Sequence, residues 1–140
     1  MTKDILVTIS GIQIGPEDSD TIEVTTGGSY YYKNGKHYIL FDEIGEEIHS
    51  VIKNTIVISP DSVDVRKKGA IDAQLCFQEG CKLNSFYTTV FGEMELGIIT
   101  DSIHMKTEEE RLELNLEYQL EINNEYVSEN SLHLLVQARG

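Results

Sequence analysis

The clearest pattern in the chain is a strict alternation of apolar and polar residues over positions 111–122. The even-numbered positions hold Leu112, Leu114, Leu116, Tyr118, Leu120 and Ile122, and every odd-numbered position is polar. A period of two predicts a β-strand that buries one face. At about 3.3 Å per residue this strand extends roughly 40 Å, too long for a flat sheet in a small domain and typical of the bent strands of a barrel.

The strand that follows should place its own apolar residues against this buried face. A loop of two residues, Asn123-Asn124, would turn Glu129 and His133 toward the core. A loop of three residues, 123–125, pairs Ile122 with Tyr126 and brings the apolar positions opposite one another: Leu116 with Leu132, Leu114 with Leu134 and Leu112 with Val136. Because the buried face decides the register, we predict the three-residue loop.

A second hairpin is indicated by Asn34-Gly35, the dipeptide best suited to a tight type I′ turn. A two-residue turn pairs Lys33 with Lys36, Tyr32 with His37, Tyr31 with Tyr38 and Tyr30 with Ile39. One face of this hairpin is the more apolar, and we expect it to point inward: Tyr30, Tyr32, His37, Ile39 and Phe41.

The rest of the chain reads as short strands separated by turn residues. Candidate strands span 5–14 (with a kink at Gly11), 21–25, 48–58, 63–67, 70–78, 83–91, 94–99 and 103–106, and the one helix candidate, 42–50, is interrupted by Gly45. Turn signals at such regular spacing favour an all-β fold. We predict a single domain over 1–140, a closed antiparallel meander barrel of about eight to ten strands, because closure removes exposed edges.

Composition narrows the classes of partner. The chain has 140 residues with 11 Lys and Arg against 24 Asp and Glu, a net charge of −13, which disfavours nucleic acid and anionic membranes as partners. The N-terminal residues lack the pattern of a signal peptide, and no run of about 18 apolar residues occurs. We therefore expect a cytoplasmic protein, a monomer or homodimer, whose Cys76 and Cys81 stay reduced.

No metal or cofactor signature is recognised. Two cysteines do not complete a zinc site, and the four histidines lack metal-ligand spacing: His37, His49, His104 and His133. We therefore predict no cofactor.

Four segments resemble a known family in the same order along nearly the whole chain. They are the runs 30–43 (YYYKNGKHYILFDE), 66–70 (RKKGA), 89–100 (TVFGEMELGIIT) and the hairpin 112–136. These segments are similar to the uncharacterised YwiB-like proteins of Firmicute bacteria, small cytoplasmic barrels resembling lipocalins. The resemblance implies a lipocalin-like barrel and carries no catalytic residues.

The basic residues are unevenly distributed. Five of the eleven lie in two short segments at predicted strand ends: Lys33, Lys36, Arg66, Lys67 and Lys68. If closure brings these segments to one rim, they form a positive mouth where Arg and Lys could hold a carboxylate or phosphate, with Gly69 allowing close approach of a ligand. The alternative is that lysines at strand ends only protect exposed edges.

Aromatic residues on inward faces suggest a ligand cavity inside the barrel, below such a mouth. Tyr30, Tyr32 and His37, with Tyr87 and Tyr118 on other inward faces, would line an apolar cavity with a few polar groups. The sequence therefore predicts binding of a small apolar or aromatic anion in the barrel. The alternative is a protein-interaction or regulatory module whose interior is filled by side chains; a third possibility is an enzyme with Tyr32 or His37 as acid or base.

Overall fold

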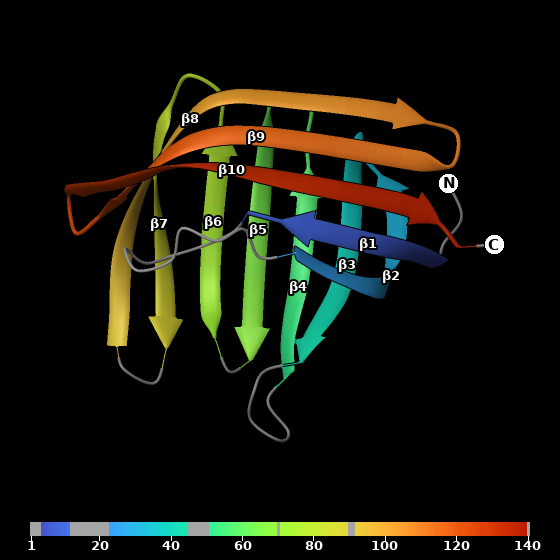
Figure 1. Cartoon of the computed structure of the whole chain (residues 1–140), viewed down its shortest axis with the longest axis horizontal. Helices are drawn as coiled ribbons and strands as arrows, with labels where there is room; N and C mark the ends of the chain where they lie inside the picture. Colours follow the sequence, from blue (N-terminus) through green and yellow to red (C-terminus); the bar gives the residue numbers. More distant parts are fainter. Residues whose placement is uncertain (1–3, 12–22, 45–50, 70, 90–91, 140) are drawn as a thin grey trace.

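The computed structural model describes residues 4–11, 23–44, 51–69, 71–89 and 92–139. These residues form ten strands (Figure 1). In chain order they are β1 (Asp4–Ser10), β2 (Glu23–Lys33), β3 (Lys36–Ile44), β4 (Val51–Ile58), β5 (Ser62–Gly69), β6 (Asp72–Gln78), β7 (Lys82–Thr89), β8 (Gly92–Glu108), β9 (Arg111–Ile122) and β10 (Glu125–Ala138).

Each strand pairs antiparallel with its neighbours in the chain, and β1 pairs with β10 to close the barrel. The predicted closed antiparallel meander is therefore confirmed, at the upper end of the expected strand number. Two pairs of predicted segments merge: residues 23–25 of the segment 21–25 join the hairpin strand in β2, and 94–99 joins 103–106 in β8; residues 21–22 lie outside the described residues. Residues 42–44 of the helix candidate belong to β3, and its positions 45–50 lie outside the described residues.

The β2–β3 hairpin has the predicted register, with Lys33 opposite Lys36 and Tyr30 opposite Ile39. Its turn residues Asn34 and Gly35 have φ angles of 54° and 76°, the left-handed values that a type I′ turn requires. Asparagine and glycine adopt this conformation with little strain, which explains why this dipeptide sets the register.

The β9–β10 loop corrects one prediction. Asn123 and Asn124 form a two-residue turn with φ angles of 52° and 69°, and Ile122 lies opposite Glu125 rather than Tyr126. A bulge between Tyr126 and Ser128 then shifts the register by one residue, so Leu132 still lies opposite Leu116. The buried face does decide the pairing, but a bulge in the strand achieves what we assigned to a longer loop.

The barrel is flattened into two layers. In Figure 1, β9, β10 and β1 cross at a steep angle in front of β3 to β7. The interior between the layers is an apolar cluster to which nearly all strands contribute, and it includes Ile39, Phe41, Leu112, Leu114 and Leu116, each at most 4% exposed. Side chains of this cluster therefore occupy the interior even though the barrel has ten strands.

Among the described residues, no helix is long and apolar enough to cross a membrane.

Candidate functional site

The two ends of the barrel carry different polar side chains. His37 on β3 lies level with Ile58 and Val63, near the β2–β3 turn, and we call this end the tyrosine end because Tyr30 and Tyr32 are there. Glu43 on β3 lies level with Ile52 and Gly69 at the opposite end. We call that end the lysine end, after Lys67.

The predicted single basic rim is wrong. Lys33 and Lys36 flank the turn at the tyrosine end, whereas Arg66, Lys67 and Lys68 lie toward the lysine end. In an antiparallel meander successive turns alternate between the two ends, and the β2–β3 and β5–β6 turns are three strands apart. The structure gives Gly69 a different close approach, because its backbone packs so closely on the Val51 carbonyl that a Cβ there would clash.

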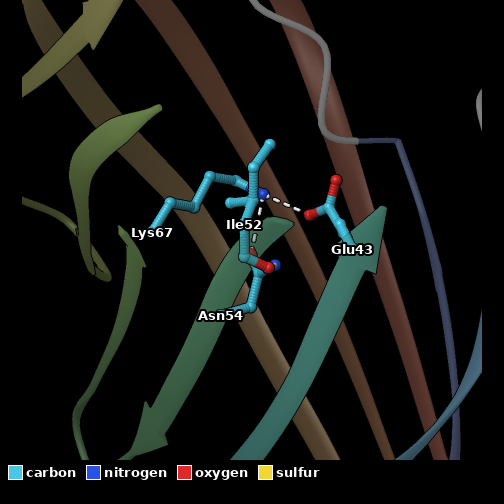
Figure 2. Close-up of polar contacts among 4 residues, drawn as sticks. All are labelled: Glu43, Ile52, Asn54 and Lys67. Carbon is cyan, nitrogen blue, oxygen red and sulfur yellow. Dashed lines mark hydrogen bonds and ion pairs between the residues drawn. The ribbon is translucent and has the colours of Figure 1, made fainter. Parts of the chain in front are cut away.

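At the lysine end, Lys67 points into the barrel and is only 8% exposed. Its Nζ donates hydrogen bonds to Glu43 Oε1 at 2.6 Å and to Asn54 Oδ1 at 2.8 Å (Figure 2). Asn54, 2% exposed, donates its amide N–H to the Ile52 carbonyl at 3.3 Å. Three neighbouring strands, β3, β4 and β5, therefore supply one connected polar network.

This network satisfies a charge that burial would otherwise penalise. An ammonium group removed from water needs a counter-ion and further hydrogen bonds. The Glu43 side chain is 29% exposed, so its carboxylate keeps some contact with solvent while it pairs with Lys67. Tyr87, on β7, lies close enough that burial and then the charge of Glu43 raise the pKa of its hydroxyl. Lys67, Glu43, Asn54 and Tyr87 thus lie together at this end.

Sequence reasoning included Lys67 and Tyr87 but missed Glu43 and Asn54. The sequence does contain a signal that Lys67 faces inward. Lys67 follows Val63 and Val65 at every second position, so it lies on the same face of the strand. Asn54 likewise interrupts an apolar face, between Ile52 and Ile56. The identity of the partner, 24 residues away from Lys67 in the chain, depends on the register of β3, β4 and β5.

On the outside of the same wall lies a pocket of about 400 Å³, which we call the outer pocket. Arg66, Gln74 and Phe86 form one row across β5, β6 and β7. The next row includes Asp72 and Thr88, with Lys68 beside them, and the pocket lining also includes Lys67 and Ala73. These two rows carry side chains on the face opposite Lys67, so the outer pocket is a groove in the outer wall.

Arg66 and Lys68 are both exposed, and neither forms an ion pair with another described residue. Phe86, on the far side of the outer pocket, is 39% exposed. The outer pocket therefore combines two cations that lack an ion-pair partner in the described ranges with one accessible aromatic ring.

The tyrosine end has a neutral polar pair. The Tyr30 hydroxyl lies 2.7 Å from His37 Nδ1, and Tyr30 is 9% exposed. Burial raises the pKa of Tyr30, with a smaller contribution from Tyr32, and burial lowers the pKa of His37. Tyr32 packs edge-on against the His37 ring but is 61% exposed, so the expectation that it points into the interior is wrong.

Tyr118 is the remaining aromatic residue of the predicted site. It is 4% exposed and packs edge-to-face on Phe77, with ring centroids 5.0 Å apart. Burial raises the pKa of its hydroxyl to about 12. Opposite it on β8, the Thr100 hydroxyl is fully buried and has no hydrogen-bond partner among the described residues.

The structure therefore divides the ten predicted site residues into separate groups. Arg66, Lys67, Lys68 and Tyr87 lie toward the lysine end, while Lys33, Lys36, Tyr30, Tyr32 and His37 lie at the tyrosine end. Tyr118 lies in the apolar interior. The groove that combines cations with an aromatic ring is on the outer wall, not between the tyrosines.

Reactive and metal-binding chemistry finds little support in the described part of the chain. Cys76 and Cys81 are free cysteines, and burial, with a hydrogen bond to Asp64, raises the pKa of the Cys76 thiol to about 11. The thiolate is the reactive form of cysteine, so Cys76 is a weak nucleophile at neutral pH. Within the described ranges, no group of three or more His, Cys, Asp and Glu side chains is arranged to hold a metal ion.

Comparison with known proteins gives matches to one family. Residues 7–134 match the family model described as a domain of unknown function, DUF1934. The chain is 30% identical over 108 residues, 77% of its length and 75% of the relative's, to the "Uncharacterized beta-barrel protein YwiB" of Bacillus subtilis (strain 168). The crystal structure of the ywiB protein from Bacillus subtilis matches with a TM-score of 0.82 and 22% identity, covering 99% of this chain and 93% of that one.

Proposed function

The chain belongs to the DUF1934 family, which includes β-barrel relatives such as YwiB, and we propose that it binds a small anion carrying an aromatic or apolar group in the outer pocket. The observation that carries this proposal is the placement of Arg66 and Lys68, both without ion-pair partners among the described residues, across a groove from Phe86. On a protein of net charge −13, two such cations beside an exposed ring form a local exception to the acidic composition.

The dimensions of the outer pocket define the ligand. Its volume of about 400 Å³ lies within the range of small-molecule sites. Arg66 and Lys68 are two residues apart on one strand, about 7 Å, and Phe86 lies two strands from Arg66, about 10 Å. A carboxylate, sulfonate or phosphate at the cations and a ring on Phe86 would therefore belong to one molecule about 10 Å long.

Asp72 sets a further constraint on the ligand. It lies in the same row as Thr88 and next to Lys68, where its carboxylate would repel an anion. The anionic group is therefore expected nearer Arg66 than Lys68, with the Gln74 amide between it and the ring available for hydrogen bonding.

The test uses 8-anilinonaphthalene-1-sulfonate, an aromatic sulfonate, as the probe. We expect it to bind with backbone amide shifts centred on Arg66, Gln74 and Phe86 in ¹⁵N NMR spectra of the full chain. The double variant Arg66→Gln/Lys68→Gln should bind it at least about tenfold more weakly, because two charge-assisted contacts are lost. Phe86→Ala should also weaken binding, through loss of ring contact.

A matched control is available at the tyrosine end. Lys33→Gln/Lys36→Gln changes the net charge by the same amount, from −13 to −15, but leaves the outer pocket intact. Equal weakening by both double variants would show only a general charge effect and would contradict the proposal. Binding that survives Arg66→Gln/Lys68→Gln unchanged would also contradict it.

A second candidate function is a protein-interaction module, and the packed apolar interior favours it. Ile39, Phe41 and the leucines of β9 fill the interior. A barrel that binds no internal ligand is expected to have such a packed interior. A cytoplasmic location and a monomeric or homodimeric state are part of both proposals, and native mass spectrometry of the protein from its own host would measure bound molecules and oligomeric state together.

A further inference from the structure

Among the described residues, strand β8 has a free edge along its second half. It pairs with β9 over Leu96–Glu108 but with β7 only over Gly92–Ile99. Beyond Thr100, where its register also shifts, no strand in the described part of the chain pairs with the other side of β8. Residues 101–108 therefore form an edge inside an otherwise closed barrel, which we call the β8 edge.

The backbone groups that face outward along this edge can be identified. The Ile103 N–H donates to Glu79 Oε2 at 2.9 Å, and Glu79 lies in the β6–β7 turn, on the side away from β9. Because backbone groups alternate in direction along a strand, the N–H and C=O groups of Met105 and Thr107 point the same way. No described backbone group bonds to these two residues on that side. Glu79 therefore ends the covered part of the edge.

The side chains of the β8 edge differ between its two faces. Ile103 packs against the apolar core, and Met105 on the same face is 41% exposed. His104 and Lys106 lie on the opposite face, and both are exposed. Lys106 Nζ lies 3.4 Å from Glu108 Oε1 on the same face, an ion pair between two largely exposed side chains. Exposed pairs of this kind contribute little, so Lys106 can exchange Glu108 for an acidic residue of an added strand. That strand would meet an apolar face on the barrel side and His104 and Lys106 on the other.

The paired edge shows which sequence pattern fits these faces. On that side, β9 places Leu116 opposite Ile103, Leu114 opposite Met105 and Glu113 opposite Lys106. We propose that the β8 edge binds an extended segment of a partner protein, with alternating apolar and acidic residues, by backbone pairing with Met105 and Thr107. Apolar residues of that segment cover Met105, and acidic residues lie beside His104 and Lys106.

A second copy of this chain is a poorer occupant. Antiparallel pairing of two copies centred on Met105 would place Asp101 opposite Glu109 and His104 opposite Lys106. It would also bring together two bodies that each carry a net charge of −13. The β8 edge is formed by residues different from those of the outer pocket, so the two proposals can fail independently.

The first test maps the contact on the unmodified full chain. The probe is the acetylated and amidated hexapeptide Leu-Glu-Leu-Asn-Leu-Glu, the sequence of residues 112–117, added to ¹⁵N-labelled protein. We expect amide shifts and slower hydrogen exchange at Met105 and Thr107, with His104 and Lys106 keeping the protection that β9 provides. A scrambled peptide, Leu-Leu-Leu-Glu-Glu-Asn, should leave Met105 and Thr107 unaffected.

Three outcomes would overturn the proposal: no change at Met105 and Thr107, equal change with the scrambled peptide, or loss of protection at His104 and Lys106. The last would mean that the peptide replaces β9 instead of extending the sheet.

Variants provide a second test. Thr107→Pro removes an N–H that faces away from β9, and proline is tolerated at strand edges when its missing N–H faces solvent. It should weaken peptide binding at least about tenfold while thermal unfolding stays cooperative. At low salt, Lys106→Glu should weaken peptide binding more than the control Lys36→Glu does. The control makes the same change of charge on another hairpin. Unchanged binding in both Thr107→Pro and Lys106→Glu would contradict the proposal.

Discussion

The two ends of the barrel bury polar groups in different ways. At the lysine end a charged ammonium is almost fully buried and is held by a carboxylate and an amide on two other strands. At the tyrosine end a phenol and an imidazole form a neutral pair across one hairpin. A buried charge requires several partners in the correct register, whereas a neutral pair needs only one. The lysine end should therefore be more sensitive to the loss of a single side chain.

The largest effect is expected from Glu43→Gln. This change removes the counter-ion and leaves the buried Lys67 ammonium with two neutral amides, that of Asn54 and that of the introduced glutamine. Because Glu43 is partly exposed and water can enter, we expect a loss of about 2–3 kcal/mol in the free energy of unfolding, below the full cost of breaking a buried pair. Urea denaturation measures it.

Lys67→Met serves as the control for that variant. It removes the charge itself and leaves Glu43 able to contact solvent, so it should cost clearly less than Glu43→Gln. If the two variants lose the same free energy of unfolding, the network stabilises the fold through packing and not through charge.

The next largest effect is expected at the tyrosine end. Tyr30→Phe removes the hydroxyl that lies 2.7 Å from His37 Nδ1 and keeps the ring in the core. A loss of about 1 kcal/mol is expected for one neutral hydrogen bond, and chemical denaturation would detect it. Tyr31→Phe, on the exposed face of the same strand, should change stability less. If Tyr30→Phe lowers the free energy of unfolding as much as Glu43→Gln, the lysine end is not the more sensitive of the two ends.

A smaller effect of opposite sign is expected for Thr100→Val. The Thr100 hydroxyl is fully buried without a partner in the described part of the molecule, and valine has almost the same shape. Replacing an unpaired polar group by an apolar one of similar shape should stabilise the protein by up to about 1 kcal/mol. Thermal unfolding would show a higher Tm. A lower Tm would indicate that a bound water satisfies the hydroxyl.

The smallest effect is the pH dependence from His37. Burial lowers the folded-state pKa of His37 below its ordinary value of 6.5, so the unfolded chain takes up its proton first as the pH falls. Well above pH 6.5 this histidine contributes no pH dependence, and between 6.5 and its folded pKa it lowers stability on acidification. His37→Gln should therefore show a flatter stability profile than the parent protein over about pH 7 to 5. A profile for His37→Gln as steep as that of the parent protein over this range would contradict the assignment to His37.

Local patterns in the sequence predicted much of the fold. Alternation over 111–122 identified β9 and its buried face, and Asn34-Gly35 identified the β2–β3 turn with its register. The β9–β10 loop was predicted wrongly because a bulge at Tyr126–Ser128 has no strong local signature. The candidate site was predicted less well: Arg66 and Lys68 were identified, but Phe86 was not, because its position across β6 depends on strand pairing.

The sequence by itself determined most of the strands and the buried face of those with clear alternation, because alternation and turn residues act within a few neighbouring positions. The alternation of Val63 and Val65 also continues to Lys67, but we assigned Lys67 to a basic rim and did not use that signal. Only the tertiary structure decided that Glu43 and Asn54 meet Lys67, that the basic segments lie at opposite ends, and that β8 has an edge unpaired by any described strand. These features depend on the register between strands and on the bending of the sheet. Both are set by interactions between residues that are far apart in the chain, so short sequence patterns do not reveal them.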